Sequence, residues 1–200
     1  MKRISIIIAS MAVVSATAVI ACNSDKSASK TSEGEALVEG TSEVSGKETL
    51  IKRGEYLVTI MGCQDCHSPK VMTPQGPAID SAHMLSGHPF SLAVPKVDPS
   101  QLQSWVLFNH NNTAFVGPWC ISFASNITSD ETGIGNWTEA QFLKAIREGK
   151  YKGMDNTRPL LPPMPWNVYR RATDDDLKAI FAYLKSTAPV ANRVPAAVPP

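Results

Sequence analysis

The stretch "GCQDCHSP", residues 62–69, is the feature that most constrains this chain of 200 residues. Cys63 and Cys66 stand three positions apart, and His67 follows the second cysteine directly. Three residues are about one turn of helix, so both thiols can lie on one side of the chain and reach one planar porphyrin. The adjacent imidazole is then held where it can meet the metal. C-x-x-C-H is the attachment sequence of c-type haem, and we expect Cys63, Cys66 and His67 to bind one covalent haem c.

Three other interpretations of the cysteine pair explain less of the sequence. A structural zinc site needs four ligands, and the chain contains no second C-x-x-C. A thioredoxin-like dithiol belongs to a βαβ pattern, whereas this motif follows a helical pattern. A structural disulfide is common in exported proteins but gives no reason for the adjacent histidine.

The N-terminus has the pattern of an export signal. Lys2 and Arg3 precede a run of apolar and small residues that ends at Cys22. The end of this run resembles the lipobox of bacterial lipoproteins, which implies cleavage before Cys22 and attachment of lipid to its thiol. The alternative is a retained anchor that is barely long enough, since a span needs about 20 apolar residues. Either way we expect the rest of the chain to be exported, on the periplasmic or outer face of a bacterial envelope membrane.

Composition divides the chain into four segments. Residues 1–21 are the predicted signal peptide, and residues 22–48 hold the lipidated cysteine and a flexible Ser- and Glu-rich tether without aromatic residues. Residues 49–187 are the predicted folded domain, and the Pro-rich residues 188–200 predict an extended tail. The chain has 19 basic and 18 acidic residues, and two of the basic ones leave with the signal, so nothing indicates nucleic-acid binding.

The first of three helical patterns leads into the cysteine pair. Leu50 and Leu57 recur at helical spacing, and Gly62 can end the helix immediately before Cys63. Ser45 offers a start for this helix.

The other two patterns lie in the second half of the chain. Thr138 and Gln141 form a capping box, and Gly149 is placed to end the helix that follows. Thr173 precedes three aspartates, which suit the positive end of a helix dipole, and Pro189 limits that helix. Together the three patterns predict an all-α fold.

Residues 70–136 are rich in Pro, Gly, Asn and Ser and show no helical period. We expect loops there, with short extended pieces around residues 114–124. Cys120 is expected to be a small buried hydrophobe. The aromatic residues of this region are expected to cover the cofactor and the core rather than to meet a partner: Trp105, Phe115, Trp119 and Phe123.

Met164, in "LLPPMPW", is the predicted sixth ligand of the iron. The neighbouring prolines stiffen its loop, so the thioether can be held toward a flat partner with little entropy left to lose. The other methionines lack such a frame, and loop histidines are more often surface or hydrogen-bonded residues. These rivals are Met61, Met72, Met84, Met154, His83, His88 and His110.

With these features in place, the chain resembles the class I c-type cytochromes. The blocks "NITSDETGIGNWTEAQFLKAIREG", "LPPMPW" and "DDDLKAIFAYLKS" are similar to the cytochrome domains that serve membrane-bound alcohol and gluconate dehydrogenases. The resemblance covers about residues 50–187. It implies the class I cytochrome c fold, here with a long loop-rich insertion between the haem signature and the methionine loop. Those subunits carry several haem signatures, whereas this chain carries one.

The resemblance also implies two structural details. The first and last helices should cross near the haem, and Gly54 and Tyr183 fit that crossing. A proline carbonyl should accept a hydrogen bond from the second nitrogen of His67, and Pro69 and Pro77 are both candidates.

These expectations describe an electron carrier rather than an enzyme, and they include no catalytic residue. With His67 and Met164 on both axial positions the iron has no open site for a substrate. The expected partners are an envelope dehydrogenase or quinol-side donor and an oxidase or other cytochrome. The alternative is a haem sensor with a displaceable sixth ligand. Arg158 and Trp166 flank the methionine loop, either as donors to the haem propionates or as a solvated arginine and a core tryptophan.

Overall fold

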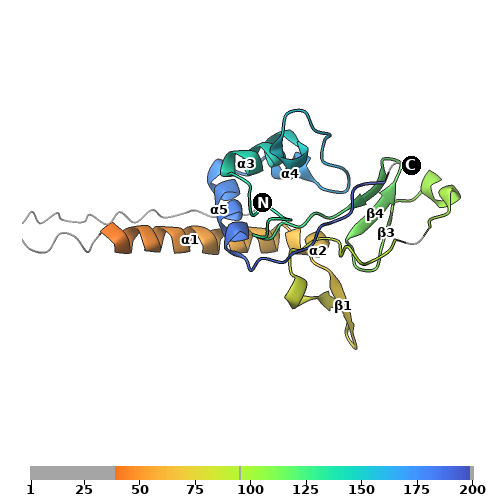
Figure 1. The fold of residues 1–200 in the computed structure, drawn as a ribbon, viewed down its shortest axis with the longest axis horizontal. Coiled ribbons are helices and arrows are strands. Elements are labelled where there is room, and N and C mark those ends of the chain that lie inside the picture. The colour runs from red at the N-terminus through yellow and green to blue at the C-terminus, as the bar shows by residue number, and fades with distance from the viewer. Residues whose placement is uncertain (1–38, 95, 199–200) are drawn as a thin grey trace, which may run out of the picture. The chain divides into compact units, whose positions relative to one another are not determined.

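The computed structural model describes residues 39–94 and 96–198 (Figure 1). The predicted signal peptide and Cys22 lie outside these residues. The helices are α1 (Glu39–Ile60), α2 (Cys63–His67), α3 (Glu139–Glu148), α4 (Trp166–Tyr169) and α5 (Asp174–Ser186). The strands are β1 (Lys70–Thr73), β2 (Gly76–Ile79), β3 (Leu107–Phe108), β4 (Ala114–Gly117) and β5 (Cys120–Phe123). Short 3-10 turns are η1 (Ser81–His83), η2 (Pro99–Gln103) and η3 (Tyr151–Gly153). None of the helices in this part of the chain has the apolar character needed to cross a bilayer.

Helix α1 crosses α5, as predicted (Figure 1), and Gly54 lies at the crossing. A Cβ atom on Gly54 would lie 1.9 Å from the carbonyl oxygen of Ala179 and 2.7 Å from Cβ of Tyr183. Since no other residue could come this close, the predicted crossing of Gly54 and Tyr183 is confirmed.

Helix α1 begins earlier than the sequence indicated. Its first residue is Glu39, not Ser45, and the helix continues without a break to Ile60. The last part of residues 22–48, predicted as a flexible tether, is therefore helical.

The predicted caps position α3 and α5. Thr138 accepts a hydrogen bond from the backbone N–H of Gln141, whose side chain accepts one in return, and Gly149 ends α3 with a φ of 64°. Thr173 caps α5 by accepting a hydrogen bond from the backbone N–H of Asp176 at 3.1 Å. The predicted start of each helix is confirmed. The apolar faces of α3 and α5 pack against α1 in one core. Its buried residues are Leu57, Val58, Leu85, Ile134, Phe142, Ile146, Leu177, Ala179, Ile180, Tyr183 and Leu184.

The expectation of an all-α fold is confirmed in part: the protein is mostly helical, but it also has two small sheets. Strands β1 and β2 form an antiparallel hairpin directly after α2, and β3, β4 and β5 form a second antiparallel sheet. The extended pieces predicted around residues 114–124 are β4 and β5, whose register pairs Ala114 with Phe123. Residues 70–136 have no helical periodicity, and apolar side chains on neighbouring strands can pack against one another there. Strand β4 is buried along its whole length.

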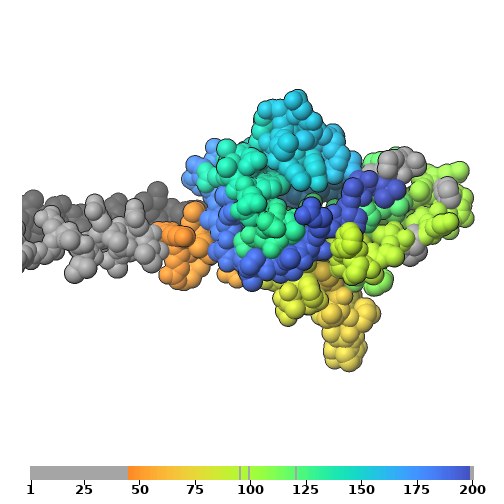
Figure 2. Space-filling model, viewed as in Figure 1, coloured from red at the N-terminus to blue at the C-terminus, as the bar shows by residue number. Residues whose placement is uncertain are grey.

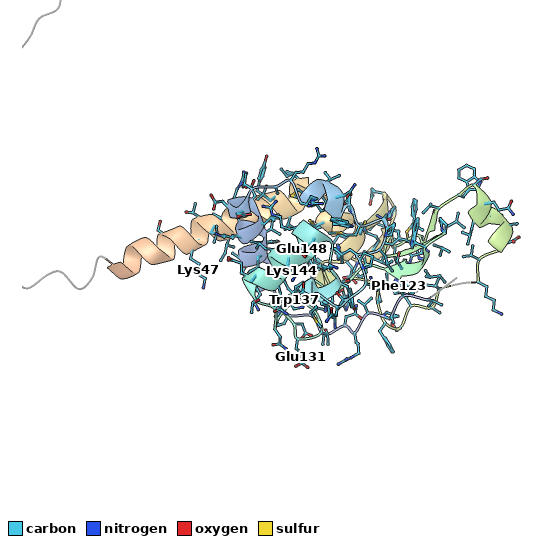
Figure 3. All side chains as sticks on the ribbon, turned by 90° about the horizontal axis from the view of Figure 1, so that it is seen from above. Lys47, Phe123, Glu131, Trp137, Lys144 and Glu148 are labelled. Carbon is cyan, nitrogen blue, oxygen red and sulfur yellow. The ribbon has the colours of Figure 1, made fainter. Side chains whose placement is uncertain are left out.

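The two sheets lie beside α2, away from the start of α1 (Figure 1). In Figure 3, Phe123 marks β5 and Lys47 marks the early part of α1, and the two lie on opposite sides of α3. The β1–β2 hairpin projects from the surface in Figure 2, and the Met72 side chain at its edge is 71% exposed.

The C-terminal residues run extended, as predicted, but they are fastened to the domain. The side chain of Asn192 donates hydrogen bonds to the carbonyl oxygens of Ser86 and His88 at 2.7 and 2.9 Å. Val198 exchanges two backbone hydrogen bonds with Ile121 on β5. The tail is therefore part of the folded unit.

Candidate cofactor site

The predicted signature lies on α2, at a sharp turn from α1. Gly62 adopts a left-handed conformation, with φ of 69°, and its carbonyl oxygen accepts a hydrogen bond from Asp65 N. This turn ends α1 and starts α2, which places Cys63 and Cys66 one helical turn apart, both with free thiols. Both side chains and that of His67 are half-buried. The local sequence therefore brings the three predicted residues together.

The surroundings of both thiols favour the protonated form. Burial raises the pKa of Cys63 to about 11. The pKa of Cys66 is also raised, mainly by burial and to a smaller extent by the nearby Asp65 carboxylate. Redox-active C-x-x-C pairs lower the pKa of one cysteine instead. The environment therefore does not support a dithiol oxidoreductase.

His67 is held by a backbone carbonyl. Its Nδ1 atom lies 2.7 Å from the carbonyl oxygen of Ser125, and since that oxygen can only accept, Nδ1 carries the proton. Burial lowers the pKa of His67, and the Ser125 bond opposes this, so the ring is neutral at pH 7. The Nε2 lone pair is then available to a metal.

The expectation of a proline carbonyl at this place is wrong. The carbonyl oxygen of Pro69 accepts a hydrogen bond from Asp80 N at 2.9 Å, and Pro77 is paired with Met72 in the hairpin. Ser125 comes just after β5, far along the chain, and nothing in its sequence marks it as the partner of His67.

Met164 lies in a tight turn beside the core. Its N–H donates to the carbonyl oxygen of Leu161 at 3.2 Å, and its own carbonyl accepts from Trp166 N at 2.9 Å. The side chain packs against the same hydrophobic cluster as that of Cys63. The turn also borders a cavity of about 410 Å³, lined by residues 160 and 162–167.

Most of the rival ligands are placed less favourably than Met164. His88 is fully buried, with Nδ1 2.9 Å from the Thr113 hydroxyl and Nε2 3.0 Å from the Leu92 carbonyl oxygen, so both ring nitrogens are engaged. His83 is exposed and pairs with Asp80, and His110 is exposed. Met72 and Met154 are exposed, whereas Met61 and Met84 pack against the core cluster as Met164 does.

Tyr169 is a residue that the sequence analysis missed. It ends α4, shortly after Met164, and its hydroxyl donates a hydrogen bond of 2.6 Å to the carbonyl oxygen of Met61. Met61 directly precedes the turn into α2. One hydrogen bond therefore joins the methionine segment to the signature. The only available signal was an aromatic residue shortly after the loop.

The residues flanking the methionine loop have structural contacts. The Arg158 guanidinium carbon lies 4.1 Å from the centre of the Tyr151 ring, and the side chain also donates to the Pro159 carbonyl oxygen at 3.0 Å. Trp166 packs against Gly149, where a Cβ atom would lie 2.4 Å from the indole. Both residues stabilise the loop from outside.

One expectation about the aromatic residues is wrong. Trp105 is 67% exposed, so it does not cover the core. Phe115 is buried on β4, and Trp119 and Phe123 are half-buried, which agrees with the expectation for those three. The side chain of Cys120 lies outside the described part of the structure.

The motif that begins at Asn126 forms a tightly tied loop beside the site. The Asn126 side chain accepts hydrogen bonds from the backbone and hydroxyl of Thr128 at 3.0 and 2.8 Å, and it donates to the Val190 carbonyl oxygen at 2.8 Å. Asp130 caps the next turn by accepting two bonds from Thr132. This loop fixes the chain between Ser125 and α3.

These residues fit a covalently attached haem. The chain offers two thiols on one turn, a neutral imidazole with Nε2 available, and a thioether packed against the cluster that also receives Cys63. Thioether bonds to cysteine and axial His/Met ligands are the donor set of c-type haem. Two hydrogen bonds from other segments support this donor set: the Tyr169 hydroxyl donates to the Met61 carbonyl oxygen, and the Ser125 carbonyl oxygen accepts from His67.

Comparison with known proteins identifies relatives among the cytochrome c subunits of dehydrogenases. No family model matches the chain. The chain is 33% identical over 147 residues to the gluconate 2-dehydrogenase cytochrome c subunit of Pantoea cypripedii, which is 72% of this chain and 25% of that protein. It is 30% identical over 152 residues to the cytochrome c subunit of the quinone-dependent alcohol dehydrogenase of Gluconobacter oxydans, 74% and 24% of the two chains. It is 29% identical over 142 residues to the fructose dehydrogenase cytochrome subunit of Gluconobacter japonicus, 70% and 22% of the two chains. The chain thus spans about a quarter of the length of these relatives.

Proposed function

Because this chain is homologous to the cytochrome c subunits of gluconate, alcohol and fructose dehydrogenases, we propose that it binds one covalent haem c and carries single electrons between proteins. One haem is proposed because the chain contains one C-x-x-C-H. The observation that carries the proposal is the arrangement of α2, where two thiols and a neutral histidine share one helical turn.

Four residues would hold the haem. Cys63 and Cys66 would supply the covalent links, and His67 would bind the iron through Nε2. Met164 is proposed as the second iron ligand, because its turn is fixed by backbone hydrogen bonds and its side chain packs against the same cluster as Cys63. When bound, haem c supplies an iron that cycles between the ferrous and ferric states.

The chain's own residues serve to orient the ligands and exclude water. The Ser125 carbonyl fixes the tautomer and the plane of the His67 ring. The core from α1, α3 and α5 covers Cys63 on one side. With two protein ligands in place, the arrangement favours electron transfer over substrate chemistry.

The proposed location is the outer side of a bacterial envelope membrane, with lipid on Cys22 as the anchor. This rests on the sequence of residues 1–22. The proposed electron donor is a dehydrogenase subunit, as the names of the relatives suggest, and the acceptor is an oxidase or another cytochrome.

The test is a mass and an absorption spectrum of the purified mature protein. We expect a mass increased by one haem, and a weak far-red band in the ferric protein, typical of sulfur ligation. Met164→Ala should abolish this band, whereas the matched control Met72→Ala, at an exposed methionine, should retain it.

Two results would contradict the proposal at different points. A mature polypeptide without haem, from cells that assemble c-type cytochromes, would exclude the function. A far-red band that survives Met164→Ala would exclude this ligand alone. Carbon monoxide binding to the reduced native protein at neutral pH would favour the haem sensor.

A further inference from the structure

We propose that the β3–β4–β5 sheet is a clamp that positions the haem-binding residues, and that Asn112 and Ser122 are its positioning residues. The inference rests on the proposed function. It concerns a region that the sequence showed only as a loop-rich insertion. Three contacts carry it, and each joins the sheet to a different part of the site.

The first contact is made by the loop between β3 and β4. The Asn112 side chain donates hydrogen bonds to the carbonyl oxygen of Asp65 at 3.1 Å and to the sulfur of Cys66 at 3.7 Å. Asn112 has a φ of 54°, a left-handed conformation that asparagine tolerates better than most residues. The tip of the hairpin therefore reaches over α2 and holds the second cysteine.

The second contact is made by β5 itself. The indole N–H of Trp119 donates to the Ser122 hydroxyl at 3.2 Å, and that hydroxyl donates to the carbonyl oxygen of Pro162 at 2.7 Å. Ser122 is only 5% exposed, and loss of its hydroxyl removes both of these hydrogen bonds at once. Pro162 stands two positions before Met164. The relay thus fixes the start of the methionine turn.

The third contact comes from the residue pair that follows β5. The Ser125 carbonyl oxygen accepts the Nδ1 proton of His67. The position of Ser125 is set by its neighbour Ala124, whose N–H donates to the Thr113 carbonyl oxygen and whose carbonyl accepts from His88 N, both at 2.9 Å. The bond to His67 is therefore anchored in the sheet.

Because the three strands are hydrogen-bonded to one another, the three contacts share one rigid support. The haem signature and the methionine turn are far apart in sequence, yet both bond to β5 or to a loop next to this sheet. A sheet that packs only for stability would not need polar contacts to every ligand-bearing segment. The arrangement instead preorganises the ligand set.

The experiment uses the mature haem-containing protein with Ser122→Ala. Its matched control is Ser129→Ala, which also removes a serine hydroxyl that donates to a carbonyl of a distant segment, Thr187, at 2.6 Å. The readout is binding of imidazole to the ferric protein, followed by loss of the far-red band. Weakening the Met164 turn by one typical hydrogen bond should raise the apparent imidazole affinity about fivefold in Ser122→Ala. Ser129→Ala should match the native protein.

The second variant, Asn112→Gly, tests the contact with the cysteine. Glycine keeps the left-handed backbone without strain and removes only the side chain. A donor to the sulfur stabilises the more electron-rich reduced state, so its removal should shift the midpoint potential to lower values. Imidazole affinity should change less than in Ser122→Ala, because the methionine turn is untouched.

The outcomes separate the clamp from the proposed function. Native imidazole affinity in Ser122→Ala together with a native potential in Asn112→Gly would overturn the clamp and leave the haem carrier intact. Equal changes in Ser122→Ala and Ser129→Ala would also overturn it, since the effect would then be one of general stability. A native protein without covalent haem would overturn both.

Discussion

The Nδ1 atom of His67 lies 2.7 Å from the carbonyl oxygen of Ser125, a residue 58 positions further along the chain. A backbone carbonyl is a partner that no side-chain substitution removes. It fixes both the tautomer and the direction in which Nε2 points. The chain therefore orients its proposed proximal ligand through main-chain geometry.

Ser125→Ala is expected to leave the reduction potential unchanged, because the bond uses the main chain and the Ser125 side chain is exposed. The Nδ1 proton of His67 should exchange slowly with solvent in the reduced protein, as seen by NMR. Ser104→Ala, at an exposed serine outside the site, is the control. A reduction potential that shifts in Ser125→Ala but not in Ser104→Ala would contradict a main-chain bond to His67.

Gly54→Ala is expected to destabilise the protein strongly. The new Cβ would lie 1.9 Å from the Ala179 carbonyl oxygen, so α1 and α5 would have to move apart. Overpacking of this kind costs about 1–3 kcal/mol or more in the free energy of unfolding. Urea unfolding followed by circular dichroism would measure the change.

Gly46→Ala is the matched control on the same helix. A Cβ atom there meets nothing within 4 Å, so the substitution should raise stability by about 0.5–1 kcal/mol through helix propensity. Equal effects of the two substitutions would show that the crossing does not constrain Gly54.

The local features of the fold could be predicted from sequence. The capping box of Thr138 and the left-handed stop at Gly149 each depend on residues within one turn, whereas the close approach at Gly54 was expected from the family resemblance. The signature was found for the same reason, since its chemistry is contained in five consecutive residues. Local rules suffice for such features.

The hydrogen bonds that support the site could not be predicted, because they join residues that are far apart in the sequence. Ser125, Ser122 and Asn112 lie in a region with no period, and they act through a carbonyl, a hydroxyl and an amide that have no distinctive pattern. The proline expected beside His67 was wrong because the insertion brings a different carbonyl to the ring. Strand pairing and loop closure decide such contacts, and neither is visible along a single sequence.

Tyr169→Phe is expected to loosen the methionine segment without unfolding the domain. It removes the hydrogen bond to the Met61 carbonyl oxygen, which contributes about 0.5–1.5 kcal/mol. In the ferric protein, the far-red band should disappear at a lower urea concentration than in the native protein. Tyr56→Phe, at an exposed tyrosine on α1, should leave the band as stable as before. Parallel behaviour of the two variants would show that Tyr169 does not position Met164.

His88 is expected to make stability depend on pH. Burial lowers its pKa below the ordinary value of 6.5, because a neutral ring suits its contacts. The Leu92 carbonyl oxygen can only accept, so Nε2 carries the proton and Nδ1 accepts from the Thr113 hydroxyl. The ring also packs against Phe123, with ring centres 4.8 Å apart, and none of these three contacts is an ionisable group.

Because the folded-state pKa is lower than the unfolded one, the unfolded chain takes up the proton first as the pH falls. The stabilisation by neutral His88 is fully present above about pH 6.5 and is lost as the pH falls toward the folded pKa. His88→Gln should therefore cost more unfolding free energy at pH 7.5 than at pH 5.5, measured by urea denaturation at both values. His83→Gln, at an exposed histidine, controls for general loss of an imidazole. If the cost of His88→Gln is the same at both pH values, the ring is not held neutral by its burial.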